Sequence, residues 1–217
     1  MINTELSKYK SVYHDWHMHT IYTDGQNTVF ELAKEAKHKS LNSIAITEHV
    51  RKNLTYNFDD LIDEIKEAEK KIKIKILIGC EAKVLNTEGE LDVRDEVIQK
   101  CDFVLGAFHK FPVNKEAYFN AIIAMLKNPK VTIWAHPFRF AYLNKIEFSN
   151  DELKQIFGHL KKTGKIFEIN SRIPPSNKVL QYIKMFKIDY CFGSDSHQKG
   201  NLLSTNFYNI WKDKLWK

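Results

Sequence analysis

The chain has 217 residues, of which 43% are hydrophobic and 28% charged, with a formal net charge of +6 and a pI near 9.0. This composition excludes a disordered chain, and no apolar run approaches the ~20 residues of a membrane span. We therefore expect one globular domain with its own core and no membrane partner. The excess of positive charge favours an anionic partner, although lysine-rich surfaces also serve solubility.

The cysteine pattern predicts a reducing environment. Three cysteines, Cys80, Cys101 and Cys191, lie beside or within apolar runs and show no CxxC spacing. Residues 1–10 contain no secretory apolar segment. An odd number of thiols without such a segment indicates a cytoplasmic protein with free cysteines rather than disulfides.

Short apolar runs alternate with helix-periodic stretches along the whole chain. Runs rich in Ile, Val, Phe and Tyr predict seven strands, at residues 12–17, 43–47, 74–79, 103–108, 131–135, 166–169 and 190–193. Amphipathic spacing predicts helices between them, at residues 28–39, 60–71, 115–127, 151–162 and 177–186. Regular βα alternation is typical of a parallel α/β fold. No linker interrupts it, so residues 1–217 are expected to form a single domain.

Histidines and acids follow these strands at the same end each time. His17 and His19 are one residue apart, so their side chains point to one face and can grip one ion. Asp15 shares that parity and is expected to orient one of the two rings. His49, His109 and His136 each close a later strand. Such a repeated placement predicts a metal site.

Acidic residues complete this pattern. Glu81 directly follows an apolar run, where an unpaired carboxylate would be costly to bury, and a bridging role between metal ions resolves that conflict. Asp195 and His197 follow the last strand, and Asp24 follows the first histidine pair. Asp195 could instead cap a following helix. All these strand ends meet at one centre only if the sheet closes, which favours a distorted seven-stranded TIM-like barrel over an open sheet.

In their order these motifs resemble the polymerase and histidinol phosphatase (PHP) superfamily. The resemblance rests on six stretches between residues 13 and 197, namely Asp15-Trp16-His17-Met18-His19 with Thr23-Asp24-Gly25, Ile46-Thr47-Glu48-His49, Gly79-Cys80-Glu81, His109, His136-Pro137 and Ser194-Asp195-Ser196-His197. Thr23 and Glu48 depart from the Ser and Asp that the family often has at these two positions. A C-terminal helix or tail is expected at about residues 200–217.

The resemblance implies three divalent ions, with zinc, manganese or iron as candidates. Carried over by residue, His17, His19, Glu81 and Asp195 hold the first ion, Glu81 bridges to a second held by His109 and His136, and Asp24, His49 and His197 hold the third. It also implies a phosphatase that hydrolyses a small phosphomonoester by attack of a metal-bound hydroxide. Asp195, His197 or a metal-bound water would protonate the leaving alkoxide, so the candidate catalytic residues are Asp195, His197 and Glu81.

Three of the four arginines fall in expected βα loops on the ligand face. These are Arg51, Arg139 and Arg172, and a guanidinium suits bidentate recognition of phosphate. We expect them to bind the substrate phosphate, with Arg139 and Arg172 as the preferred pair. Helix capping or ordinary salt bridges are the alternative roles.

Several other functions remain open at this point. The basic pI supports a nuclease or 3′-end-processing phosphatase with nucleic acid as partner, but the lysines form no single-face run with interleaved aromatics. An amidohydrolase-type C–N hydrolase would place a bridging lysine where Glu81 stands. A non-enzymatic domain stabilised by metals predicts lost ligands, and none is lost. The sequence does not assign an oligomeric state.

Overall fold

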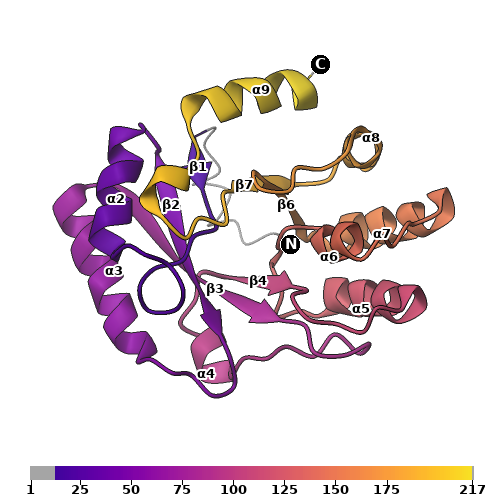
Figure 1. Cartoon of the computed structure of the whole chain (residues 1–217), viewed down its shortest axis with the longest axis horizontal. Coiled ribbons are helices and arrows are strands. Elements are labelled where there is room, and N and C mark those ends of the chain that lie inside the picture. Colours follow the sequence, from indigo (N-terminus) through magenta and orange to yellow (C-terminus); the bar gives the residue numbers. More distant parts are fainter. Residues whose placement is uncertain (1–12, 217) are drawn as a thin grey trace.

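The computed structural model describes residues 13–216, which form a nearly closed parallel barrel (Figure 1). Its seven strands are hydrogen-bonded in chain order, and each pairs in parallel with the next. They are β1 (His14–Asp15), β2 (Ser43–Val50), β3 (Lys75–Lys83), β4 (Phe103–Ala107), β5 (Ile133–Trp134), β6 (Ile166–Asn170) and β7 (Tyr190–Gly193). The seven-stranded α/β barrel expected from the sequence is confirmed.

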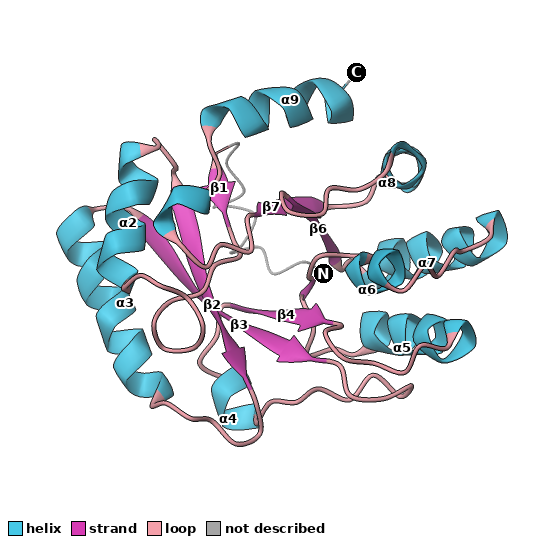
Figure 2. Cartoon of the chain, viewed as in Figure 1, coloured by secondary structure: helices cyan, strands magenta, loops and turns pink. Residues whose placement is uncertain are grey.

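Helices follow the strands and lie outside them, as the secondary-structure colouring shows (Figure 2). They are α2 (Val29–His38), α3 (Phe58–Ile72), α4 (Asp95–Ile98), α5 (Lys115–Lys127), α6 (Arg139–Leu143), α7 (Asn150–Thr163), α8 (Asn177–Phe186) and α9 (Thr205–Trp216), with a 3₁₀ turn at Lys199–Asn201. The five expected internal helices are present. The short helices α4 and α6 were not predicted, because five residues or fewer cannot display a helical period.

The barrel closes between its first and last strands. Trp16 N donates to Phe192 O at 3.0 Å, and Met18 forms a parallel bridge with Ser196. Helix α9 covers this seam, where the rings of Tyr208 and Tyr13 meet edge to face and the Tyr208 hydroxyl donates to His14 O. Of the expected strand at residues 12–17, His14 and Asp15 form β1 and Trp16 pairs across this seam. Residue 12 lies outside the described residues.

Strand alternation divides the apolar side chains into two layers. Ile44 and Ile46 of β2 pack outward against the helices, whereas Ala45 belongs to a smaller inner cluster with Leu77 and Leu105. The outer layer is much the larger, as expected for a barrel whose helices bury one apolar stripe each. Both faces of β2 to β4 are thus buried, which explains their nearly continuous apolar runs.

Side-chain caps fix where the flanking helices begin. Thr28 and Ser149 each form a capping box with the glutamate three residues on, Glu31 and Glu152, at the starts of α2 and α7. Ser176 caps α8 by accepting from Val179 N at 3.3 Å. The Ser-containing start signals read from the sequence before α7 and α8 are therefore used as caps.

Predictions about the cysteines and about membrane spans also came from the sequence. Cys80 and Cys101 form no disulfide, and Cys80 and Cys191 are buried whereas Cys101 is half-buried. Among the described residues, no helix combines the length and apolar character that crossing a bilayer requires. Cytoplasmic residence remains a prediction.

Candidate metal centre

Strand alternation carries polar side chains onto the inner face at one rim of the barrel. On β3 the inward series Leu77 and Gly79 continues to Glu81, and on β4 the series Leu105 and Ala107 continues to His109 beyond the strand. Since parallel strands share one direction, their carboxyl ends meet at the same rim. The nine predicted ligands come together there.

Glu81 lies at the centre of this cluster and is 1% exposed. Its Oε1 atom is 3.0 Å from His109 Nε2 and 2.8 Å from His136 Nε2. Its Oε2 atom is 2.8 Å from His49 Nδ1 and 3.6 Å from His19 Nε2. One carboxylate thus faces histidines from four segments, the arrangement that a bridging ligand requires.

The first pair of histidines faces Asp195 beside this carboxylate. Asp195 Oδ1 lies 3.7 Å from His17 Nε2 and 3.5 Å from His19 Nε2, and His17 Nε2 lies 3.6 Å from Glu81 Oε1. Two atoms that each bind a tetrahedral ion at ~2.0–2.1 Å are about 3.4 Å apart. The distances between these side-chain atoms are therefore close to those expected when both atoms bind one ion, and they are longer than hydrogen bonds.

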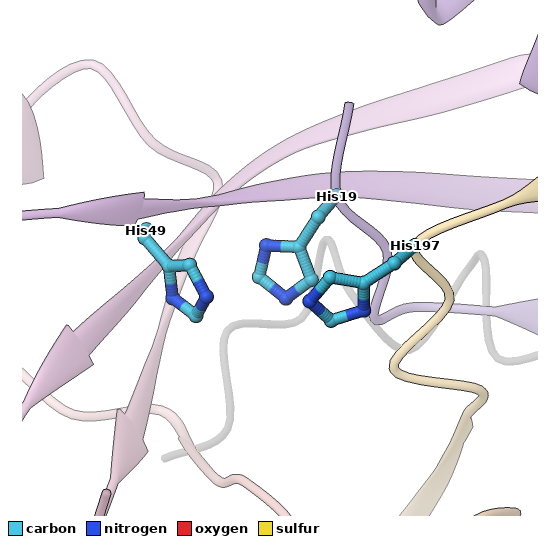
Figure 3. Close-up of side chains that lie close together, drawn as sticks. All are labelled: His19, His49 and His197. Atoms are coloured by element: carbon cyan, nitrogen blue, oxygen red, sulfur yellow. The ribbon is translucent and has the colours of Figure 1, made fainter. Parts of the chain in front are cut away.

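A third group gathers where Asp24 approaches the rim. Asp24 Oδ2 is 3.4 Å from His49 Nε2 and 3.3 Å from His197 Nε2. His19, His49 and His197 come from the ends of β1, β2 and β7, and their rings converge on a common space (Figure 3). Their ring nitrogens offer ligand atoms within 4.8 Å of one another.

Unpaired buried atoms show that the cluster fits metal ions. Within residues 13–216, the buried side-chain nitrogens and oxygens without a hydrogen-bond partner are all at this rim, namely His17 Nε2, His19 Nδ1, His19 Nε2, His49 Nδ1, Glu81 Oε2 and Asn170 Nδ2. His49 Nδ1 and Glu81 Oε2 lie 2.8 Å apart, but without the geometry of a hydrogen bond. An orphaned buried polar atom is costly unless a ligand satisfies it. Imidazole nitrogens with carboxylate oxygens form a donor set that suits zinc, manganese and iron.

The protonation states of three candidate ligands, His19, Glu81 and Asp195, suit cation binding. Burial lowers the pKa of His19 to about 4, helped by the neighbouring His49 and His17, so its ring is neutral near pH 7. Burial alone would raise the pKa of Glu81, but His17 and hydrogen bonds from His109 and His136 hold it well below its usual range. The pKa of Asp195 is likewise lowered, because His19 and His17 outweigh its burial. Both carboxylates are therefore ionised and able to bind cations.

Two of the candidate ligands have a strained backbone conformation. His136 has φ of 29° and Asp195 has φ of 51°, in the region that non-glycine residues rarely adopt. Strain of this kind, which costs about 1–3 kcal/mol, clusters at functional sites. Asp195 does not cap a helix, since the following 3₁₀ turn has Gln198 at its N-cap.

Glu168, which was not among the residues predicted from the sequence, supports the cluster from β6. Its Oε1 atom accepts a hydrogen bond from His17 Nδ1 at 2.7 Å, and its Oε2 atom accepts from the backbone N–H of His136. The side chain is 1% exposed. Its position inside an apolar strand is the same signal that singled out Glu81.

The orienting role expected for Asp15 is therefore wrong. Its two carboxylate oxygens accept backbone N–H groups, from Ser194 at 2.8 Å and from Leu203 at 3.1 Å. Asp15 thus anchors the segment that carries Asp195, while Glu168 holds the His17 ring. Gly193 allows this close packing, because an added Cβ would lie 2.0 Å from Glu168 Oε1 and 2.7 Å from His17 Cβ.

The two departures from the family pattern contact each other. The Thr23 hydroxyl donates to Glu48 Oε2, and Thr20 donates to Glu48 Oε1 through its backbone N–H at 2.6 Å. Glu48 is fully buried, and burial raises its pKa above the usual value. This contact fixes the turn that presents Asp24 to the cluster.

The three candidate arginines lie in different surroundings. Arg172 reaches the cluster, with Nη1 at 3.1 Å from Asp195 Oδ2 and 3.5 Å from His197 Nδ1. Arg51 instead donates to its neighbour's carbonyl and lies 3.7 Å from Asp92 Oδ2. Arg139 is half-buried at the first residue of α6, and among the described residues no hydrogen bond or ion pair joins its side chain to the cluster.

The fold and the rim define a parallel α/β barrel with a candidate histidine–carboxylate metal centre. The chain belongs to the PHP domain family, whose model matches residues 15–172. It is 34% identical over 167 residues to a probable phosphatase from Acetivibrio thermocellus, covering 72% of this chain and 64% of that protein. A probable phosphatase from Caldanaerobacter subterraneus subsp. tengcongensis is 31% identical over 163 residues, covering 72% of this chain and 61% of that protein. The matches thus span less than two thirds of these two relatives.

Solved structures share the same barrel. Histidinol phosphate phosphatase from Lactococcus lactis subsp. lactis Il1403, complexed with zinc, L-histidinol and phosphate, has a TM-score of 0.70 at 21% identity, covering 94% of this chain and 92% of that one. A putative histidinol phosphatase from Listeria monocytogenes has a TM-score of 0.68 at 17% identity, covering 87% and 96%. At these identities the likeness establishes the fold.

Proposed function

We propose that this protein is a metal-dependent phosphatase that hydrolyses a phosphomonoester. The observation that carries the proposal is the set of unpaired, buried imidazole and carboxylate atoms around Glu81. The names of the related probable phosphatases support the same reaction class.

The proposed ligand sets follow the three groups at the rim. His17, His19, Glu81 and Asp195 would hold one ion, Glu81 with His109 and His136 a second, and Asp24, His49 and His197 a third. Divalent ions at such a site lower the pKa of bound water and neutralise phosphate oxygens. Zinc is the first ion to test, because the similar L. lactis structure was solved with it.

The chain's own residues then bind the ester and move protons. Arg172 is the arginine that we propose to bind a phosphate oxygen, and the position of its guanidinium beside Asp195 and His197 supports this role. His197 is the protein group proposed to protonate the leaving alkoxide, because the lowered pKa of Asp195 keeps that carboxylate ionised. Glu168 and Asp15 keep the ligands and their loop in position.

The proposal is tested by stripping the protein with a chelator and adding back zinc, manganese or iron. Phosphate release is then measured on small phosphomonoesters and on 3′-phosphorylated oligonucleotides. We expect release from small esters, restored by an added ion and abolished in a His17→Ala variant. His159→Ala is the matched control, because His159 lies on α7, where its Nδ1 atom is 2.9 Å from Gln155 O, and it is not among the candidate ligands. Full wild-type activity in both the stripped protein and His17→Ala would overturn the proposal.

A further inference from the structure

A cleft of about 650 Å³ opens beside the metal centre. One wall comes from α6 and the segment that leads to α7, and the other from the β6–α8 loop and the start of α8. A volume of this size is typical of small-molecule sites, which span about 300–1,000 Å³.

The cleft and the metal centre share their boundary. Pro137, which lines the cleft, directly follows the ligand His136, and Arg172 lines the cleft while its Nη1 atom contacts Asp195. Asn170 holds this boundary in shape, because its Oδ1 atom accepts the backbone N–H groups of Arg172 at 3.0 Å and Ile173 at 3.3 Å. A phosphate bound by Arg172 would therefore have the cleft next to it.

The chemistry of the walls is mainly apolar. Phe138, Ile146, Phe148 and Ile173 are half-buried around the cleft, and Val179 is buried behind them. The polar side chains that line it, which are Glu147, Arg172, Ser176 and Lys178, are exposed. The covered part of the cleft thus offers carbon surface and aromatic edges.

We propose that this cleft binds the alcohol portion of the substrate, and that the substrate is a phosphomonoester with an aromatic or branched aliphatic body. The inference rests on the proposed phosphatase function and adds the substrate class to it. Polyhydroxylated esters such as sugar phosphates are disfavoured, because their hydroxyls would lose water against apolar walls without gaining hydrogen bonds.

The test compares two esters with similar alkoxide leaving groups, 2-phenylethyl phosphate and glycerol 3-phosphate. In the zinc-loaded wild type, burial of the phenyl group is expected to raise kcat/KM for 2-phenylethyl phosphate at least tenfold above that for glycerol 3-phosphate. Ile173→Asp places a charge in the cleft and should remove most of this preference. Ile146→Ser on the opposite wall is a second variant, and thermal melting reports whether both fold.

Met185→Asp is the matched control, because Met185 is 68% exposed on α8 and does not line the cleft. It should keep the wild-type preference. Calorimetric binding of 2-phenylethylphosphonate against methylphosphonate gives a readout without turnover, and the phenyl compound should bind more tightly to wild type than to Ile173→Asp.

The outcomes separate the two proposals. If both esters are hydrolysed equally, or if Ile173→Asp leaves the preference intact, the cleft assignment is wrong and the phosphatase proposal stands. If no ester is hydrolysed and neither phosphonate binds, both proposals fall. The assignment is supported if wild type binds 2-phenylethylphosphonate more tightly than methylphosphonate and if Ile173→Asp weakens that binding. The same variant should also lose the preference for 2-phenylethyl phosphate in turnover.

Discussion

Glu168 holds His17 through a hydrogen bond of 2.7 Å between Oε1 and Nδ1, which leaves Nε2 of that ring directed toward Glu81 and Asp195. The same carboxylate accepts the backbone N–H of His136. One buried side chain on β6 therefore orients two of the proposed ligands. A carboxylate behind a metal-binding imidazole fixes its ring orientation and raises its basicity.

Replacing Glu168 with glutamine is expected to weaken metal binding about 10–100-fold. The amide keeps one acceptor but places N–H donors against either the His17 ring or the His136 backbone, each of which needs an acceptor. Competition with a chelator whose signal reports zinc measures the affinity. Glu116→Gln, on the exposed face of α5, is the control and should match wild type. Equal affinities of both variants would show that Glu168 does not position the ligands.

Arg172→Gln is expected to lower kcat/KM for a phosphomonoester about 10–100-fold, the range of a lost charge-assisted hydrogen bond. Arg51→Gln should change it much less, because Arg51 lies beside Asp92 rather than at the cluster. Steady-state phosphate release on the zinc-loaded proteins makes the comparison. A larger loss in Arg51→Gln than in Arg172→Gln would reverse the assignment.

Metal affinity is expected to fall as the pH is lowered. Burial tends to lower the pKa of His17, but the charges of Glu168 and Glu81 outweigh it and raise that pKa well above the ordinary value in the metal-free chain. Protonation of His17 stabilises the metal-free fold below the ordinary pKa of about 6.5, and this stabilisation is lost as pH rises through the raised value. An ion must displace that proton, so binding releases protons and strengthens with pH.

Equilibrium dialysis against zinc at a series of pH values, followed by elemental analysis, measures this dependence. The retained zinc should decrease steadily from about pH 8 to about pH 5. For each protein, we define the pH at which half of its maximal zinc is retained. This pH should be lower in Glu168→Gln than in wild type, because the carboxylate charge that raises the His17 pKa is gone. Zinc retention that does not vary with pH would contradict the assignment of His17 as a ligand.

Most of the fold could be predicted from the sequence, because each strand is a short run of β-branched and aromatic residues. Residues 190–193 were predicted as β7 to the residue, while the expected strand at 131–135 is β5 with only two ladder residues. Its flanks still pair outside the ladder, since Thr132 N donates to Val104 O and Ala135 N to Gly106 O. The difference lies at the strand boundaries and leaves the path of the chain unchanged.

The convergence of the nine candidate ligands was also predictable, because parallel strands in a closed barrel share one rim. The surroundings of the side chains were not. The partner of Arg51 is Asp92, in a loop that no local pattern connects to it, and Asp15 turned toward the backbone of Ser194 and Leu203. The cleft depends on how two loops far apart in the sequence face each other.

The central claim is that one buried carboxylate, Glu81, joins the metal sites. Elemental analysis of zinc per chain, together with phosphate release, tests it most directly in wild type and Glu81→Gln, with Glu116→Gln as control. We predict up to three ions in wild type and in the control, and clear loss of both metal and phosphate release in Glu81→Gln. Wild-type metal content and phosphate release in Glu81→Gln would contradict the account.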